Sequence, residues 1–157
     1  MILIDTHAHL QNPAFAGDLD AILERAARAG VHACLVPGST LLDSRAAVAL
    51  SERFAAGPCS LYAAVGIHPT DVDASFEVDL PELRDLAQHP RVVAIGEIGL
   101  DYYWPQQSQR TWPCADPPLQ RRALEKQLAL AAELHLPVII HDRDAHADVF
   151  AMLGDWI

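Results

Sequence analysis

The chain of 157 residues repeats a strand-like segment followed by a helix-like segment about every thirty residues, and this period limits its possible folds more than any other feature. Short apolar runs rich in β-branched residues begin near residues 2, 32, 61, 92 and 137. Runs of this kind are typical of strands buried in a parallel sheet. Helical periodicity in the intervals predicts helices over residues 18–29, 42–56, 79–88, 118–135 and about 143–153.

Two architectures accommodate five consecutive βα units. An open doubly wound sheet is complete with five units, whereas a (β/α)8 barrel needs about 250 residues. Length therefore favours the open sheet, but the first strand favours the barrel. Its alternation places Asp5, His7 and His9 on one face, so that this face turns polar toward the end of the strand. A strand of a doubly wound sheet is apolar on both faces, and we expect a barrel-type sheet.

The interval between the fourth and fifth strands is longer, about 45 residues, because a segment with little periodicity is inserted at residues 101–117. It contains three prolines and two tryptophans, which predicts a loop. Long loops that follow the strands of an α/β protein commonly lie at its functional end. The aromatic residues of this loop are expected either to stack on a base or a ring or to pack the loop against the protein: Tyr103, Trp104 and Trp112.

Composition excludes several classes of protein. The formal charge of −10 comes from 21 acidic and 11 basic residues, which argues against a broad basic surface that follows a nucleic-acid backbone. A site with divalent metals would still hold a single phosphate locally. The three cysteines show no Cys-x-x-Cys spacing, and no apolar stretch reaches about 18 residues. The first residues do not resemble a secretory signal, so we expect a cytoplasmic protein without a membrane partner.

Four of the five predicted strands terminate in histidine or glutamate. His68 lies in the end of the third strand, Glu97 in that of the fourth and His141 in that of the fifth, in addition to the His7 and His9 pair of the first. A carboxylate at a buried strand end is costly unless it is paired or bound to metal. Nitrogen and oxygen ligands from separate strands suit a catalytic divalent site with open positions. The other four histidines are predicted at helix ends or on helix faces, in contact with solvent: His32, His89, His135 and His146.

Four motifs carry a family resemblance. They are Ile-Asp-Thr-His-Ala-His-Leu at 4–10, Gly-Ile-His-Pro at 66–69, Gly-Glu-Ile-Gly-Leu-Asp-Tyr-Tyr at 96–103 and Pro-Val-Ile-Ile-His-Asp-Arg at 137–143. Their order and spacing over nearly the whole chain resemble those of the TatD family of metal-dependent deoxyribonucleases. The resemblance implies a (β/α)8 barrel of the metal-dependent hydrolase type, with two divalent ions (Mg, Mn or Zn) at the carboxyl ends of its strands.

The resemblance also implies roles for single residues. His7 and His9 would hold the first ion, Glu97 would bridge both ions, and His141 would hold the second. His68 would act near the scissile phosphate as a catalytic and substrate-binding residue. Three further residues would shape the substrate site or contact the substrate: Asp101, Tyr102 and Arg143.

The family has two more metal ligands, a histidine of the sixth strand and an aspartate near the eighth, and this sequence stops before both. We therefore expect residues 1–157 to form one partial barrel domain of about five βα units, without the sixth to eighth. Such a chain would have little activity alone, and a second chain or self-association would cover its open edge.

Three functions agree with these features. The first is hydrolysis of phosphodiester bonds, with the ends of single-stranded DNA as the substrate that the resemblance implies. The second keeps the metal site but acts on a small amide, lactone or ester, because related barrels use similar ligands for such bonds. The third is an inactive remnant that binds only metal or a partner.

Overall fold

The computed structural model describes residues 1–107, 114–154 and 156. The middle of the long loop lies outside the described residues, and so does Trp112, for which a stacking or packing role was expected.

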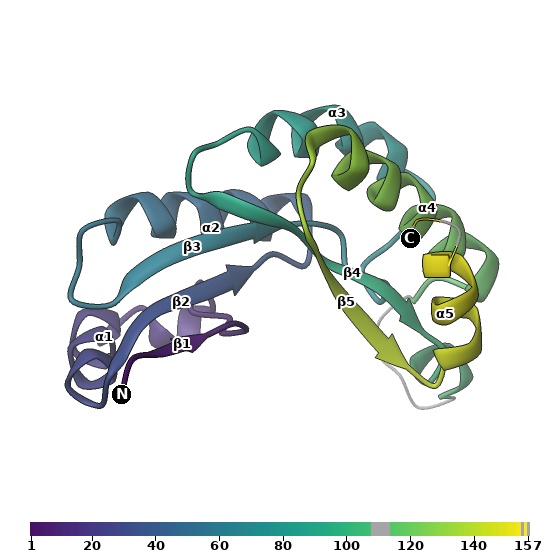
Figure 1. Ribbon diagram of the computed structural model, residues 1–157. Coiled ribbons are helices and arrows are strands. Elements are labelled where there is room, and N and C mark those ends of the chain that lie inside the picture. Colours follow the sequence, from purple (N-terminus) through teal and green to yellow (C-terminus); the bar gives the residue numbers. More distant parts are fainter. Residues whose placement is uncertain (108–113, 155, 157) are drawn as a thin grey trace.

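All five predicted strands are present and parallel. They are β1 (Leu3–Asp5), β2 (Val31–Pro37), β3 (Ser60–Val65), β4 (Val92–Asp101) and β5 (Val138–Arg143). Their order in the sheet is β1-β2-β3-β4-β5, so strands that follow one another in sequence are also neighbours in space. A doubly wound sheet reverses its strand order at a switch point, whereas a barrel does not. The sheet curls into an arch (Figure 1), and the expected barrel-type fold is confirmed.

Helices follow the strands in the predicted alternation. They are α1 (Leu19–Arg28), α2 (Leu41–Arg53), α3 (Phe76–Ala87), α4 (Pro117–Leu134) and α5 (His146–Gly154), with short 3-10 turns at Pro13–Phe15 and Trp104–Gln106. Figure 1 shows α2, α3 and α4 over the convex side of the arch. The third helix begins three residues before its predicted start, because Phe76 is buried in a small cluster with Ile67 and Val72. Periodicity within the helix does not reveal this contact, which joins α3 to the segment after β3.

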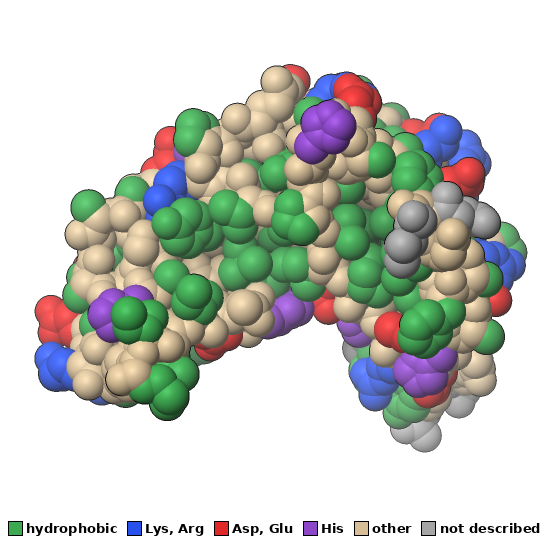
Figure 2. Space-filling model, viewed as in Figure 1, with side chains coloured by type: hydrophobic (Ala, Val, Ile, Leu, Met, Phe, Trp, Pro, Cys, Tyr) green, Lys and Arg blue, Asp and Glu red, His purple; other side chains and the backbone are tan. Residues whose placement is uncertain are grey.

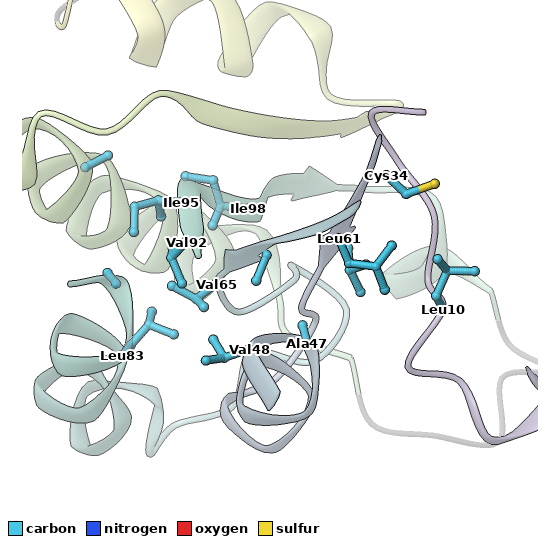
Figure 3. Close-up of a cluster of buried hydrophobic side chains, with 14 of the residues drawn as sticks. Leu10, Cys34, Ala47, Val48, Leu61, Val65, Leu83, Val92, Ile95 and Ile98 are labelled. Carbon is cyan, nitrogen blue, oxygen red and sulfur yellow. The ribbon is translucent and has the colours of Figure 1, made fainter. Parts of the chain in front are cut away.

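The main core lies between the sheet and the helices on its convex side. Val65 of β3 and Ile95 and Ile98 of β4 are completely buried, and they lie near Leu83 of α3 and Val48 of α2 (Figure 3). Burial of an aliphatic side chain of this size contributes roughly 1.5–3 kcal/mol to folding. The core thus ties the middle strands to α2 and α3 and leaves the carboxyl ends of the strands available for polar side chains.

The outer edges of β1 and β5 have no partner strand within the described part of the chain. Ile2 and Ile4 beside the first edge are 74% and 64% exposed. Figure 2 shows hydrophobic side chains over the middle of the arch and a hollow beneath it. Exposed apolar strand edges favour pairing with another chain. That a second chain or a second copy covers them stays a prediction.

None of the described helices has the length and apolar character needed to cross a membrane.

Candidate metal centre

A β-bulge in β4 presents Glu97. Ile95 pairs with Val138 and Ile98 with Ile140, so β4 has one residue more than β5 between these pairs. Bulges near functional sites redirect a side chain. Here the extra residue keeps Ile95 and Ile98 in the core while the backbone N–H of Glu97 donates to the Gly38 carbonyl oxygen after β2, at 3.0 Å. β4 ends at Asp101, so the prediction that the fourth strand ends in the segment 95–101, which contains Glu97, is confirmed.

His7 and His9 meet through a turn and not along a strand. β1 ends at Asp5, so the expectation that both histidines belong to the strand is wrong. The His7 N–H donates to Asp5 Oδ1 at 3.0 Å, and the Ala8 N–H donates to the Leu35 carbonyl oxygen at 3.0 Å. The first bond is local to the turn, and the second holds the turn against β2. The Nε2 atoms of the two imidazoles lie 3.2 Å apart, so their side chains still converge.

The Glu97 carboxylate faces two separate groups of histidines. Its Oε2 atom lies 3.2 Å from His7 Nε2 and 3.8 Å from His9 Nε2. Its Oε1 atom lies 3.1 Å from His141 Nδ1 and 3.9 Å from His68 Nε2. We call His7, His9 and Glu97 the first group and His68, Glu97 and His141 the second group. In each group the ligand atoms all lie within 4.8 Å of one another.

Two carboxylates hold the imidazole of His141. Its Nδ1 contacts Glu97, and its Nε2 lies 3.0 Å from Asp101 Oδ2. Burial alone would lower the pKa of His141, but hydrogen bonds to Glu97 and Asp101 and the charges of both outweigh it, so the pKa is raised. Burial opposes ionisation of Glu97, yet the hydrogen bond from His141 and the nearby histidines leave its pKa lowered. Glu97 is therefore an ionised carboxylate at neutral pH.

His68 has the opposite electrostatic environment. Burial, followed by the charge of His141, lowers its pKa to about 4, so the imidazole is neutral at pH 7. The Thr70 N–H donates to His68 Nδ1 at 3.2 Å. In a neutral imidazole one ring nitrogen is a donor and the other an acceptor. The Thr70 hydroxyl oxygen lies closer to the same Nδ1 atom, 2.7 Å away, and Nε2 is the ring atom that faces Glu97.

The remaining predicted residues lie around this centre with different partners. Asp101 is buried, and its Oδ1 accepts hydrogen bonds from the backbone N–H groups of Tyr103 and Trp104. The Tyr102 hydroxyl donates to Asp148 on α5, 2.6 Å away, so the structure does not bring it into either group. The Arg143 guanidinium stacks on the ring of Tyr103, 4.0 Å from its centroid, at the carboxyl ends of β4 and β5.

Sequence reasoning did not find the contact between Asp101 and His141. Its signal was present, because Glu97, Gly99 and Asp101 alternate along one strand and alternate residues share a face. Of the four histidines expected at helix ends or faces, His32 instead lies in β2, where its apolar neighbours continue the strand. The others agree with the expectation: His89 contacts Glu52, His135 caps α4 and His146 begins α5.

The donor set of both groups fits divalent cations. Each group combines imidazole nitrogen with carboxylate oxygen and contains no thiolate, as in catalytic sites that keep positions open for water and substrate. One carboxylate with its two oxygens directed to different groups is suited to bridging two cations. His7, His9, Glu97, His68 and His141 are the residues that could hold them.

Residues 4–156 match the family model described as TatD related DNase. The chain belongs to the TatD family. This TatD-family chain is 38% identical to the uncharacterized metal-dependent hydrolase YabD of Bacillus subtilis over 154 residues, which are 98% of the chain and 56% of that relative. It is 39% identical to the 3'-5' ssDNA/RNA exonuclease TatD of Enterobacter lignolyticus over 155 residues, 99% of the chain and 55% of that relative.

A solved structure agrees with the sequence comparisons. The TatD homologue YJJV of Escherichia coli K12 superposes with a TM-score of 0.79 at 35% identity, over 98% of this chain and 55% of that one. The TatD-family chain thus spans about half the length of the relatives that it matches.

Proposed function

We propose that this chain provides the two-cation centre of a TatD-family phosphodiesterase that acts on the ends of single-stranded nucleic acid. The observation that carries the proposal is the position of Glu97, whose Oε2 faces His7 and His9 while its Oε1 faces His68 and His141. A pair of bound divalent cations supplies Lewis-acid polarisation of a phosphoryl oxygen and makes a water more acidic.

The residues of the chain would divide the remaining work. Glu97 bridges the groups, and His7, His9 and His141 contribute nitrogen ligands. His68 is neutral at pH 7, so its ring has one N–H, which could donate a hydrogen bond to a phosphate or a proton to the leaving oxygen, and one free lone pair, which could bind a cation.

The substrate class is inferred from the mouth of the site. The Arg143 guanidinium stacks on Tyr103 and lies 5.2 Å from the ring of Trp104, which restrains it without neutralising its charge. A guanidinium held this way is suited to a phosphate, and the adjacent aromatic rings to an unpaired base. A relative is named 3'-5' ssDNA/RNA exonuclease, which supports single strands as the substrate.

The test uses the purified chain, an end-labelled single-stranded DNA and Mn²⁺ or Mg²⁺. We expect cation-dependent cleavage that falls at least about 100-fold in Glu97→Gln, because both groups lose their shared carboxylate. The matched control is Glu24→Gln, which removes an exposed carboxylate of α1 that pairs with Arg28. Cleavage that needs no cation, or that is equal in wild type and Glu97→Gln, would refute the proposal. An aryl ester or amide assayed in parallel distinguishes the small-substrate hydrolase.

A further inference from the structure

Two completely buried glutamines of α4 reach across to the segments that carry the second group. Gln120 and Gln127 are 0% and 1% exposed, although most of the inward face of this helix is apolar. They are seven residues apart, about two helical turns, so they lie on the same face. A buried carboxamide costs free energy unless its hydrogen bonds are made.

Each glutamine binds both polar backbone groups of a single residue. Gln127 Oε1 accepts from the Ile67 N–H at 2.7 Å, and its Nε2 donates to the Ile67 carbonyl oxygen at 3.1 Å. Gln120 Oε1 accepts from the Asp101 N–H at 2.7 Å, and its Nε2 donates to the Asp101 carbonyl oxygen at 2.8 Å. The carboxamide replaces the neighbouring strand that would otherwise pair with this backbone.

The bound residues adjoin the second group. Ile67 lies beyond the end of β3 and directly precedes His68, whose own N–H donates to the Ser39 carbonyl oxygen at 2.8 Å. Asp101 is the last residue of β4, and its carboxylate contacts His141. A shift in either backbone would therefore move an imidazole of the second group, whereas His7 and His9 are held by β2.

We propose that α4 is the positioning element of the second group, with Gln127 fixing the backbone at His68 and Gln120 fixing the backbone at Asp101. Both glutamines are positioning residues, and neither touches the cations or the substrate. The inference rests on the proposed function for the presence of a second cation, but not for the hydrogen bonds themselves. It makes the affinity for the second cation dependent on a helix outside the site.

The test is a Mn²⁺ titration of the full chain by calorimetry, in wild type, Gln127→Met and Gln120→Met. Methionine keeps nearly the length and volume of glutamine but makes neither hydrogen bond. We expect the second cation to bind about 10- to 100-fold more weakly in both variants, the usual effect of removing an outer contact, while the affinity for the first cation stays unchanged. If Gln127→Met does not fold, Gln120→Met carries the test, since it removes only the hydrogen bonds to Asp101 and Ala115.

The control for general destabilisation is Leu83→Ala, which opens a cavity in the core near Val65 of β3 and Val92 of β4 and keeps both glutamines in the sequence. It should lower stability and leave both cation affinities as in wild type. Wild-type affinity in both methionine variants, or an equal loss in Leu83→Ala, would overturn the inference.

A wild type that binds fewer than two cations would contradict the proposed function instead. In that case amide hydrogen exchange without metal tests the inference by itself. We expect the exchange rate of the His68 N–H, divided by that of the amides of β3, to be at least about tenfold higher in Gln127→Met than in wild type. An unchanged ratio would overturn the positioning role of Gln127.

Discussion

At the scale of single residues, His68 and His141 show how position alone separates the chemistry of two identical side chains. Their rings lie 4.2 Å apart, centroid to centroid, in an edge-on arrangement. Two carboxylates hold His141 and raise its pKa, whereas burial and the neighbouring His141 lower that of His68 to about 4. A proton added to this pair therefore goes to His141, and His68 stays neutral over most of the pH range.

This difference predicts a dependence of stability on pH. The pKa of His68 is below the unfolded value of 6.5, so between pH 6.5 and 4 the unfolded chain binds more protons and stability falls as pH falls. The contribution of His68 is complete above pH 6.5, and up to about 3 kcal/mol of it is lost toward pH 4. The raised pKa of His141 acts in the opposite direction, since its contribution is present below pH 6.5 and is lost at higher pH.

The measurement is urea unfolding with a chelator at several pH values, in wild type and His68→Asn. The free energy of unfolding of the variant should decrease less between pH 6.5 and 4. Parallel curves for the two proteins would show that His68 titrates normally.

Gly99 gives a second prediction at the residue scale. Its φ is +150°, and a Cβ built there would lie 2.0 Å from the carbonyl oxygen of His141. Gly99→Ala should therefore lower the free energy of unfolding by more than about 2 kcal/mol, through both backbone strain and the collision with β5. The control is Gly17→Ala, where nothing lies within 4 Å of the added Cβ, and thermal unfolding compares the two. Equal stability of the two variants would mean that the backbone of β5 moves to accommodate the added Cβ at little cost in free energy.

At the scale of elements, α4 links the fold to the site. The start of the helix has an ordinary capping signal: its N-cap Asp116 accepts a hydrogen bond from the Leu119 N–H at 3.1 Å. Its inner face places Gln120 and Gln127 against the ends of β4 and β3. Periodicity predicted this helix from Pro118 to His135, and it runs from Pro117 to Leu134. The pattern did not show that two of its inward residues are polar because they form hydrogen bonds with the neighbouring backbone.

The cap of α4 can be tested separately. Asp116→Ala should lower the free energy of unfolding by about 1 kcal/mol, because the Leu119 N–H loses its acceptor. Asp116→Asn retains an acceptor oxygen and should lose only a small part of this stability. Chemical denaturation of the three proteins makes the comparison, and an Asn variant as unstable as the Ala variant would contradict a capping role.

At the scale of the whole molecule, the candidate metal centre joins distant parts of the chain. The first and second groups draw residues from the turn after β1, the segment after β3, β4 and β5. These segments converge because parallel strands all bring their carboxyl ends to the same side of a barrel-type sheet. Binding at such a site stabilises the fold as a whole, since the unfolded chain does not keep the ligands together.

Divalent cations should therefore raise the melting temperature. At a free Mn²⁺ concentration 100 times the dissociation constant, the added stability is about 2.7 kcal/mol for one site. Differential scanning calorimetry should show an upward shift that a chelator reverses and that Glu97→Gln abolishes. A shift of the same size in Glu97→Gln would place the cations elsewhere on the protein.

The number and order of the βα units could be predicted from the sequence, because the periods of two and 3.6 residues are local properties of strands and helices. The polar residues at the strand ends could also be predicted to be functional, because burying a histidine or glutamate there costs free energy unless the side chain is paired or binds a metal. Only the tertiary structure decided how these residues meet. The bulge that turns Glu97, the contact of Asp101 with His141 and the reach of Gln120 and Gln127 depend on register between strands and on helices distant in sequence, and no local pattern contains those relations.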